Sequence, residues 1–320
     1  MKKIIIGCIF FITNLICYGQ STDSIDFKQV RTLNGNKFKF FVNGNSVNEN
    51  LYDEVKNFKE GFAAVKREGK WCYIDLKGIE IVPPTFFQVS DFSNGFAIVM
   101  NNKLDKAFLN KSGKMITTLK YFAANDFQEG YAAVATGTYP NLKWGFINEE
   151  GKEVVIPKYS QVDDFKDGIA KVFLKNKVGF INETGKEITQ IIYDYSGSRN
   201  LGNGLATLEQ EINNRTSFVG VINKKGEWMF KRGQIYFQVV GSFSNKYLIV
   251  DNGSKFGIID HSGNIKIEIN MKKIDPLGSW TRNADSLKLG RLYVENYGDY
   301  FYIDENLNCV NMDDAIPCSQ

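Results

Sequence analysis

The amino-acid sequence predicts an all-β protein, built as a tandem array of antiparallel units that are each a β-hairpin or three strands. Composition is the first reason, because 25 Phe and 15 Tyr favour half-buried pleated surfaces and 29 Gly against 6 Pro favour many tight turns. The second reason is a short motif that returns every 34 to 38 residues. A fixed period of this length is typical of repeat folds, in which neighbouring units share one core.

The repeated motif has two blocks. The first reads Phe-x-x-Gly-aromatic-Ala-x-Val and occurs at residues 58–65, 92–99 and 127–134, with weaker copies at 165–172 and 201–208. The second block ends in an aromatic or apolar residue, then Ile or Leu, then Asp or Asn. It occurs at 71–75, 106–110, 144–148, 178–182, 219–223 and 256–260, with a weak copy at 300–304. In the first block Ala and Val alternate with period two, which predicts a strand whose Ala face is packed.

Each good copy of the second block ends in Asp or Asn, with Gly three residues later. The six pairs are Asp75 and Gly78, Asn110 and Gly113, Asn148 and Gly151, Asn182 and Gly185, Asn223 and Gly226, and Asp260 and Gly263. This is the residue choice of a type I turn. Each unit is therefore predicted to run strand, loop, strand, turn and short third strand.

The two blocks, with Val-Ile-Pro closing a unit at 155–157, resemble the bacterial WG repeat, which is named for its Trp-Gly pair. Trp144 and Gly145 keep the pair, Trp71 keeps the Trp, and Gly179, Gly220 and Gly257 keep the Gly. The resemblance covers about residues 51–269. It implies a β-rich repeat array that serves as a binding or structural module.

The extent of the repeats gives the predicted domain order. A signal peptide occupies residues 1–19, an N-terminal capping hairpin 20–50, the repeats 51–270, and a degenerate final repeat with a C-terminal tail 271–320. Within the cap, residues 38–47 predict a hairpin that turns at Gly44 and Asn45. Uneven repeat spacing favours an open superhelical stack, and a closed six- or seven-bladed β-propeller is the alternative.

The first residues predict export. Two lysines precede an apolar run from Ile4 to Cys17, and the small residue Gly19 suits a cleavage site after Gly19 or Gln20. We expect the mature chain in the periplasm, at the outer membrane or outside the cell, without stable membrane insertion. A lipid anchor is the alternative, since Gly7-Cys8 faintly resembles a lipobox.

Removal of this segment leaves three cysteines in an oxidising compartment. Cys309 and Cys318 are close enough in sequence to pair, and Cys72 is expected to be a buried thiol. Lys and Arg number 39 against 36 Asp and Glu, with no basic run, so nucleic acid is not an expected partner.

The sequence offers little material for catalysis, and we expect no enzyme, metal or cofactor. His261 is the only histidine and falls in a turn, while Glu60, Glu129 and Asp167 precede turn glycines. A carboxylate-dependent glycosidase is the less favoured alternative. The Asp/Asn turns lack the dense acidic loop of a calcium site, and no phosphate-binding glycine loop occurs.

The expected function is presentation of an extended surface to a protein partner, with envelope or extracellular glycan as the alternative ligand. Trp71 and Trp144 lie in the repeat register and are predicted to be core residues. Trp228 and Trp280 fall outside it, and Tyr139 lies in a long loop. These three are the candidate surface binding residues.

Overall fold

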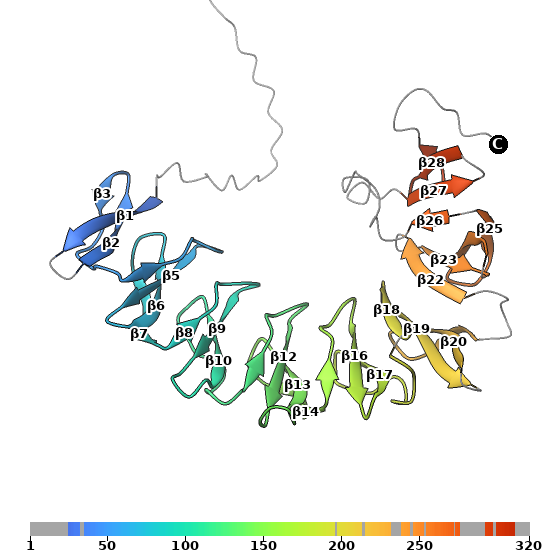
Figure 1. The fold of residues 1–320 in the computed structure, drawn as a ribbon, viewed down its shortest axis with the longest axis horizontal. Coiled ribbons are helices and arrows are strands. Elements are labelled where there is room, and N and C mark those ends of the chain that lie inside the picture. Colours follow the sequence, from blue (N-terminus) through green and yellow to red (C-terminus); the bar gives the residue numbers. More distant parts are fainter. Residues whose placement is uncertain are drawn as a thin grey trace, which may run out of the picture. The chain divides into compact units, whose positions relative to one another are not determined.

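The computed structural model is all-β, with no helix among the residues it describes (Figure 1). It describes residues 25–32, 35–195, 197–212, 215–231, 238–243, 246–252, 254–271, 273–275, 292–296 and 299–310. The predicted signal peptide, Trp280 and Cys318 lie outside these ranges, so the predictions for them and for a Cys309–Cys318 pair stay predictions. The chain divides into two compact units, residues 1–85 and 86–320.

The first unit contains two antiparallel sheets in chain order, β1-β2-β3 and β4-β5-β6-β7. The strands are β1 (Ile25–Thr32), β2 (Gly35–Val42), β3 (Asn45–Ser46), β4 (Glu54–Val55), β5 (Phe62–Arg67), β6 (Lys70–Asp75) and β7 (Glu80–Phe86). Val42 pairs with Asn45, so the hairpin turns at Asn43 and Gly44, one residue earlier than predicted. Both residues have positive φ, as a type I′ turn requires, and Asn-Gly is the pair that adopts it most readily.

The second unit continues with six antiparallel sheets among its described residues, each formed by consecutive strands. Two sheets have three strands: β8 (Gln88–Val89), β9 (Phe96–Met100), β10 (Lys106–Asn110); and β15 (Gln161–Val162), β16 (Ile169–Leu174), β17 (Lys177–Asn182). Two four-stranded sheets are β11 (Ala123–Ala124), β12 (Tyr131–Thr136), β13 (Lys143–Asn148), β14 (Glu153–Tyr159); and β18 (Arg199–Gly202), β19 (Leu205–Ile212), β20 (Arg215–Asn223), β21 (Trp228–Lys231). The last two are β22 (Gln238–Phe243), β23 (Tyr247–Asp251), β24 (Phe256–Asp260), β25 (Ile265–Met271); and β26 (Lys273–Asp275), β27 (Leu292–Asn296), β28 (Asp299–Ile303), β29 (Cys309–Val310). The prediction of repeated small antiparallel sheets is confirmed.

The first block begins with a tight hairpin turn, whereas the sequence pattern predicted only a strand. In the first copy Lys59 and Phe62 exchange backbone hydrogen bonds of 2.8 and 2.9 Å, and Glu60 and Gly61 between them have φ of 49° and 88°. The corresponding pairs Asn94 and Gly95, Glu129 and Gly130, Asp167 and Gly168, and Asn203 and Gly204 also have positive φ. A short strand therefore precedes each block, in addition to the three strands predicted. The acidic residues before these glycines are turn residues, as predicted.

The second block ends in the predicted turn. The side-chain oxygen of Asn182 accepts hydrogen bonds from the backbone N–H of Thr184 at 3.1 Å and Lys186 at 3.0 Å, and Gly185 N–H donates to the Asn182 carbonyl at 2.8 Å. The equivalent bonds recur at Asp75, Asn110, Asn223 and Asp260. Even the decayed copy keeps them at Asp304. Each side chain thus satisfies backbone donors, which explains the conserved spacing within the chain without a metal.

Successive sheets are joined by the Ala face and by the first Phe of each motif. Ala132 and Val134 are fully buried in a cluster with Phe108 of the preceding sheet and with Phe127. The Phe127 ring lies 4.2 Å from the ring of Phe96 and 5.1 Å from that of Phe108, both in the preceding sheet. A small Ala on the packed face leaves room for these rings, as predicted.

The same contact recurs elsewhere in the chain. Phe165 packs 4.7 Å from both Tyr131 and Phe146 of the preceding sheet. In the first unit, Phe58 lies 5.9 Å from Phe27 and 5.7 Å from Phe40. In these three units, the first Phe of the motif therefore packs between two aromatic rings of the sheet before it.

The Gly of the Trp-Gly pair is explained by a close backbone approach. A Cβ placed on Gly145 would lie 2.1 Å from the carbonyl oxygen of Val155 and 2.7 Å from the nitrogen of Pro157. The pairing of β13 with β14 shifts register at this point. The fourth strand therefore crosses directly over Gly145, and no side chain fits there.

An ion pair and a hydrogen bond, together called the polar tie, also link neighbouring units. Lys158 Nζ lies 2.9 Å from Glu187 Oε1, and the Tyr159 hydroxyl donates to the same oxygen at 2.9 Å. The hydrogen bond from Lys158 is the largest cause of the lowered pKa of Glu187, and burial is the largest cause that raises the pKa of Tyr159 to about 12. The preceding unit repeats the tie with Lys120, Tyr121 and Glu153.

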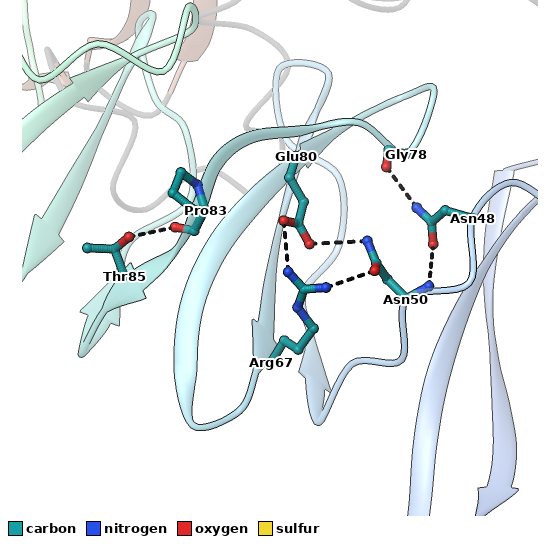
Figure 2. Close-up of polar contacts among 7 residues, drawn as sticks. All are labelled: Asn48, Asn50, Arg67, Gly78, Glu80, Pro83 and Thr85. Atoms are coloured by element: carbon teal, nitrogen blue, oxygen red, sulfur yellow. Dashed lines mark hydrogen bonds and ion pairs between the residues drawn. The ribbon is translucent and has the colours of Figure 1, made fainter.

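In the first unit a different network holds the segment before β4. Arg67 donates to Asn50 Oδ1 at 2.8 Å and to Glu80 Oε2 at 3.1 Å, and Asn48 Nδ2 donates to the Gly78 carbonyl at 2.8 Å (Figure 2). These contacts join residues 48–50 to β5 and to the turn before β7. The link between the two sheets of this unit is therefore polar as well as apolar.

Candidate functional site

The meander gives each sheet of the second unit two different ends. The tight hairpin of the first block and the Asp/Asn turn lie at one end, here called the turn end. In every sheet of this unit, the loop joining the second and third strands lies at the opposite end, here called the loop end. Sheet β11–β14 shows this arrangement, with its turns at Glu129 and Asn148 and its loop at residues 137–142.

Side chains at the turn end reach from one unit to the next. The Glu129 carboxylate accepts hydrogen bonds from the backbone N–H of Asp167 at 2.7 Å and Gly168 at 3.1 Å. Asp167 Oδ2 in turn accepts from the N–H of Asn203 at 2.8 Å. These carboxylates are occupied in joining consecutive turns.

The same residues line a polar pocket of about 640 Å³. Its lining residues are Glu129, Asp167, Gly168, Glu183, Asn203, Lys224 and His261. His261 lies in its turn as predicted but is half-buried; burial lowers its pKa, and its Nε2 forms no hydrogen bond. Among the described residues no group of three or more His, Cys, Asp or Glu could hold a metal ion.

Burial raises the pKa of two carboxyls, Asp126 and Glu209. They belong to different sheets, β11–β14 and β18–β21, and the sheet β15–β17 stands between these in the chain. Stacked sheets lie about 10 Å apart, so the two carboxyls are too far apart to act on one glycosidic bond.

The loop end of the first two sheets of this unit carries exposed apolar side chains. The exposed fractions are 49% for Phe87, 51% for Leu104, 41% for Phe122 and 80% for Tyr139. Phe87 and Phe122 occupy equivalent places, because each backbone N–H donates at 2.9 Å to a carbonyl near the end of the second strand of its sheet. The acceptors are Met100 in β9 and Ala135 in β12. We call these four residues the loop-end surface. Exposed aromatics grouped in this way are typical of interaction sites.

An apolar pocket of about 240 Å³ lies beside the loop-end surface, between the sheet β8–β10 and strand β11. Its lining residues are Gln88, Val89, Ser90, Ile98, Met100, Lys106 and Ala124. Gln88 follows Phe87 directly, and Lys106 lies against Phe122: its Nζ donates to the Phe122 carbonyl at 2.5 Å and sits 5.8 Å from the ring centre. Phe87 and Phe122 do not line the pocket themselves, but each adjoins a residue that does: Gln88 in the chain and Lys106 by contact.

The lysines near the loop-end surface differ from those of the sheet β15–β17 in their ion pairs. Lys103 and Lys143 are exposed and, within the described part of the chain, pair with no carboxylate. By contrast, Lys177 lies 2.6 Å from Asp194 and Lys171 lies 3.3 Å from Asp163. Lys103 and Lys143 consequently place positive charge beside the apolar side chains, with Asp105 as the one carboxylate in the loop of residues 101–105.

Of the three candidate residues from the sequence, Tyr139 and Trp228 belong to different sheets, and Trp280 lies outside the described residues. Tyr139 lies on the loop-end surface in the same sheet as Phe122. Trp228 lies on the outer strand β21 and is 37% exposed, with Lys231 Nζ 5.0 Å from the centre of its ring. Of the two tryptophans predicted to be core, Trp71 is buried and Trp144 is half-buried.

Sequence reasoning missed Phe87 and Phe122, although a signal was present. Both stand eight residues before a tight-turn glycine, where other units have Asp53 and Ser160. A large apolar residue at a place that is otherwise polar is the kind of departure that marks a surface site.

Comparison with known families agrees with the repeat seen in the structure. The family model described as "WG containing repeat" matches residues 49–71, 73–104, 108–137, 144–177 and 179–210. The chain belongs to the WG-repeat family. The Asp/Asn turn continues beyond the matched segments of this WG-repeat protein, at Asn223 and Asp260.

No curated protein matches the sequence. Solved structures with partial similarity include BamB from Moraxella catarrhalis (12% identity, TM-score 0.30, 84% of this chain and 93% of that one) and apo AztD from Citrobacter koseri (12%, 0.27, 90% and 77%). A eukaryotic initiation factor matches at 10% identity with TM-score 0.38 over 91% of this chain and 84% of the other. TM-scores below 0.5 do not establish a shared overall fold. Within the described ranges, no helix is long and apolar enough to cross a membrane.

Proposed function

We propose that this WG-repeat protein is exported, has no catalytic role, and binds a protein partner through the loop-end surface. The observation that carries the proposal is the exposure of Phe87 and Phe122, at 49% and 41%, next to residues that line an apolar pocket. A few large side chains, aromatic ones among them, supply most of the binding energy at protein interfaces. Phe rings without a polar group suit a protein partner better than a sugar.

The position of the surface supports the same proposal. Loop ends face away from the turn-end contacts that join units, so a partner can bind without disturbing the core. Tyr139 extends the apolar area, and Lys103 and Lys143 form a charged rim beside it. An apolar centre with a polar rim is typical of protein interfaces.

Glycan binding is the second candidate, and the polar turn-end pocket favours it. Glu183 and Lys224 in that pocket form no hydrogen bond or ion pair within the described part of the chain, so both are available to ligand hydroxyls. A glycosidase is less well supported, because Glu129 and Asp167 already accept hydrogen bonds from backbone N–H groups.

A pull-down tests the proposal. The mature chain, beginning at Ser21, is immobilised and incubated with native envelope and culture-medium proteins, with cell-wall glycans as competitors. A saturable protein partner that is lost with Phe87→Ala and Phe122→Ala, but kept with Ile156→Ala, supports the proposal. Ile156 is the matched control, since it is 72% exposed but lies on the outer strand β14. Retention of the partner by both Phe variants, or elution by glycan, would contradict it.

Export is tested separately. The full chain is expressed in a bacterium, and the protein from each cell fraction is sequenced from its N-terminus. We expect cleavage after Gly19 or Gln20 and recovery outside the cytoplasm. An intact Met1 in the cytoplasmic fraction would contradict export.

A further inference from the structure

We infer that the partner presents an extended acidic segment, which places one apolar side chain in the apolar pocket beside the loop-end surface and carboxylates beside the neighbouring lysines. This inference rests on the proposed function and names the chemistry of the partner. Three features carry it: the size of the pocket, the unpaired lysines and the spacing of the sheets.

The pocket is the right size for one side chain. Its volume of about 240 Å³ is below the 300 Å³ or so at which pockets begin to enclose whole small ligands. Val89, Ile98 and Met100 give it apolar walls, and Lys106 is the charged residue at its border. A Leu, Met or Phe side chain from a partner would bury its surface there and leave its backbone outside.

The lysines call for carboxylates on the partner. Lys103 and Lys143 have no carboxylate partner in the described part of the chain, and Lys106 Nζ donates to a carbonyl oxygen, that of Phe122. The one acidic residue of the loop 101–105, Asp105, accepts a hydrogen bond from Asn101 at 3.0 Å and keeps its negative charge. Three lysines, Lys103, Lys106 and Lys143, therefore stand against one carboxylate. Complementary charge around an apolar anchor speeds association and selects the partner.

The spacing of the sheets favours an extended segment. Phe87 and Phe122 occupy the same place in two successive sheets, and packed sheets lie about 10 Å apart. An extended chain advances roughly 3.3 Å per residue, so about three residues reach from one Phe to the other. A short peptide is thus long enough to contact both rings and to place a side chain in the adjoining pocket.

The experiment is a selection from a random peptide display library on the immobilised mature chain, followed by affinity measurements on the selected peptides. We expect enriched peptides to contain Asp or Glu within a few residues of Leu, Met or Phe. Their dissociation constants should rise about tenfold or more with Lys103→Glu/Lys143→Glu, and also between low salt and about 0.5 M salt. The matched control Lys152→Glu/Lys186→Glu makes the same charge change at the turn end and should leave binding unchanged.

The possible results separate the two proposals. Enriched peptides that are uncharged or basic, yet lose binding with Phe122→Ala, would overturn the acidic segment and leave the loop-end surface intact. Peptides that bind the Phe122→Ala and Phe87→Ala variants as well as the original would overturn both. A selection that enriches no peptide would overturn the extended segment alone, because the pull-down tests a folded partner independently.

Discussion

Replacing Phe127 by Ala tests whether the inserted Phe holds neighbouring sheets together. Its side chain is 1% exposed and contacts Phe96 and Phe108 of the preceding sheet. Loss of a fully buried Phe costs about 3–5 kcal/mol, and the two ring contacts place this site toward the upper part of that range. We expect the free energy of unfolding, measured by urea titration with circular dichroism, to fall by about this amount.

Hydrogen exchange tells where that loss occurs. Since each sheet contacts only its neighbours, exchange should accelerate in β9, β10 and β12, while β24 keeps its protection. Phe87→Ala is the matched control, because the exposed Phe87 ring should contribute less than about 0.5 kcal/mol. A loss below about 1 kcal/mol for Phe127→Ala, or an equal loss for both variants, would refute the inserted-Phe account.

Three further predictions concern stability and reactivity. Gly145→Ala should destabilise the protein by about 1–3 kcal/mol in urea titration, because its Cβ would lie 2.1 Å from the Val155 oxygen; an unchanged midpoint would refute the close approach. The pKa of Glu187 is lowered, so its tie to Lys158 stabilises the fold above the ordinary pKa of 4.5 and is lost as pH falls through the lower folded value. Glu187→Gln should therefore flatten the loss of stability below pH 4.5, whereas an unaltered pH profile would argue against the tie. Burial raises the pKa of Cys72 to about 12, so in the chain beginning at Ser21 with Cys309→Ser/Cys318→Ser a thiol reagent should react only after unfolding; fast reaction with native protein would count against this.

Much of the fold could be predicted because the repeated residues form turns and strands with their neighbours in sequence. Asn182 and Gly185 have a spacing that fits one turn, and that turn forms through the side chain itself. The alternation of Ala132 and Val134 likewise predicted a packed face, which contacts the preceding sheet. The opposite face is packed as well, because Ala133 is fully buried against the following sheet. These features depend on residues close in sequence, where the number of solutions is small.

The site could not be predicted in the same way. Whether Phe122 is buried or exposed depends on which strand lies over it, and the two-residue strand β11 was too short to leave a pattern. The role of Gly145 depends on a crossing by β14, which only the folded backbone reveals. Tyr139 was found because its loop departs from the repeat, and that departure is visible in the sequence.

The two ends of the sheets also differ in how much change they can accept. At the turn end, Glu129 reaches the backbone of the next turn, so a longer turn would pull the two apart. At the loop end, the connection shrinks to Lys175 and Asn176 between β16 and β17, yet extends over residues 137–142 between β12 and β13. Natural variation and engineering can thus lengthen or exchange the second kind of connection while the scaffold stays constant, so new recognition can evolve here one loop at a time.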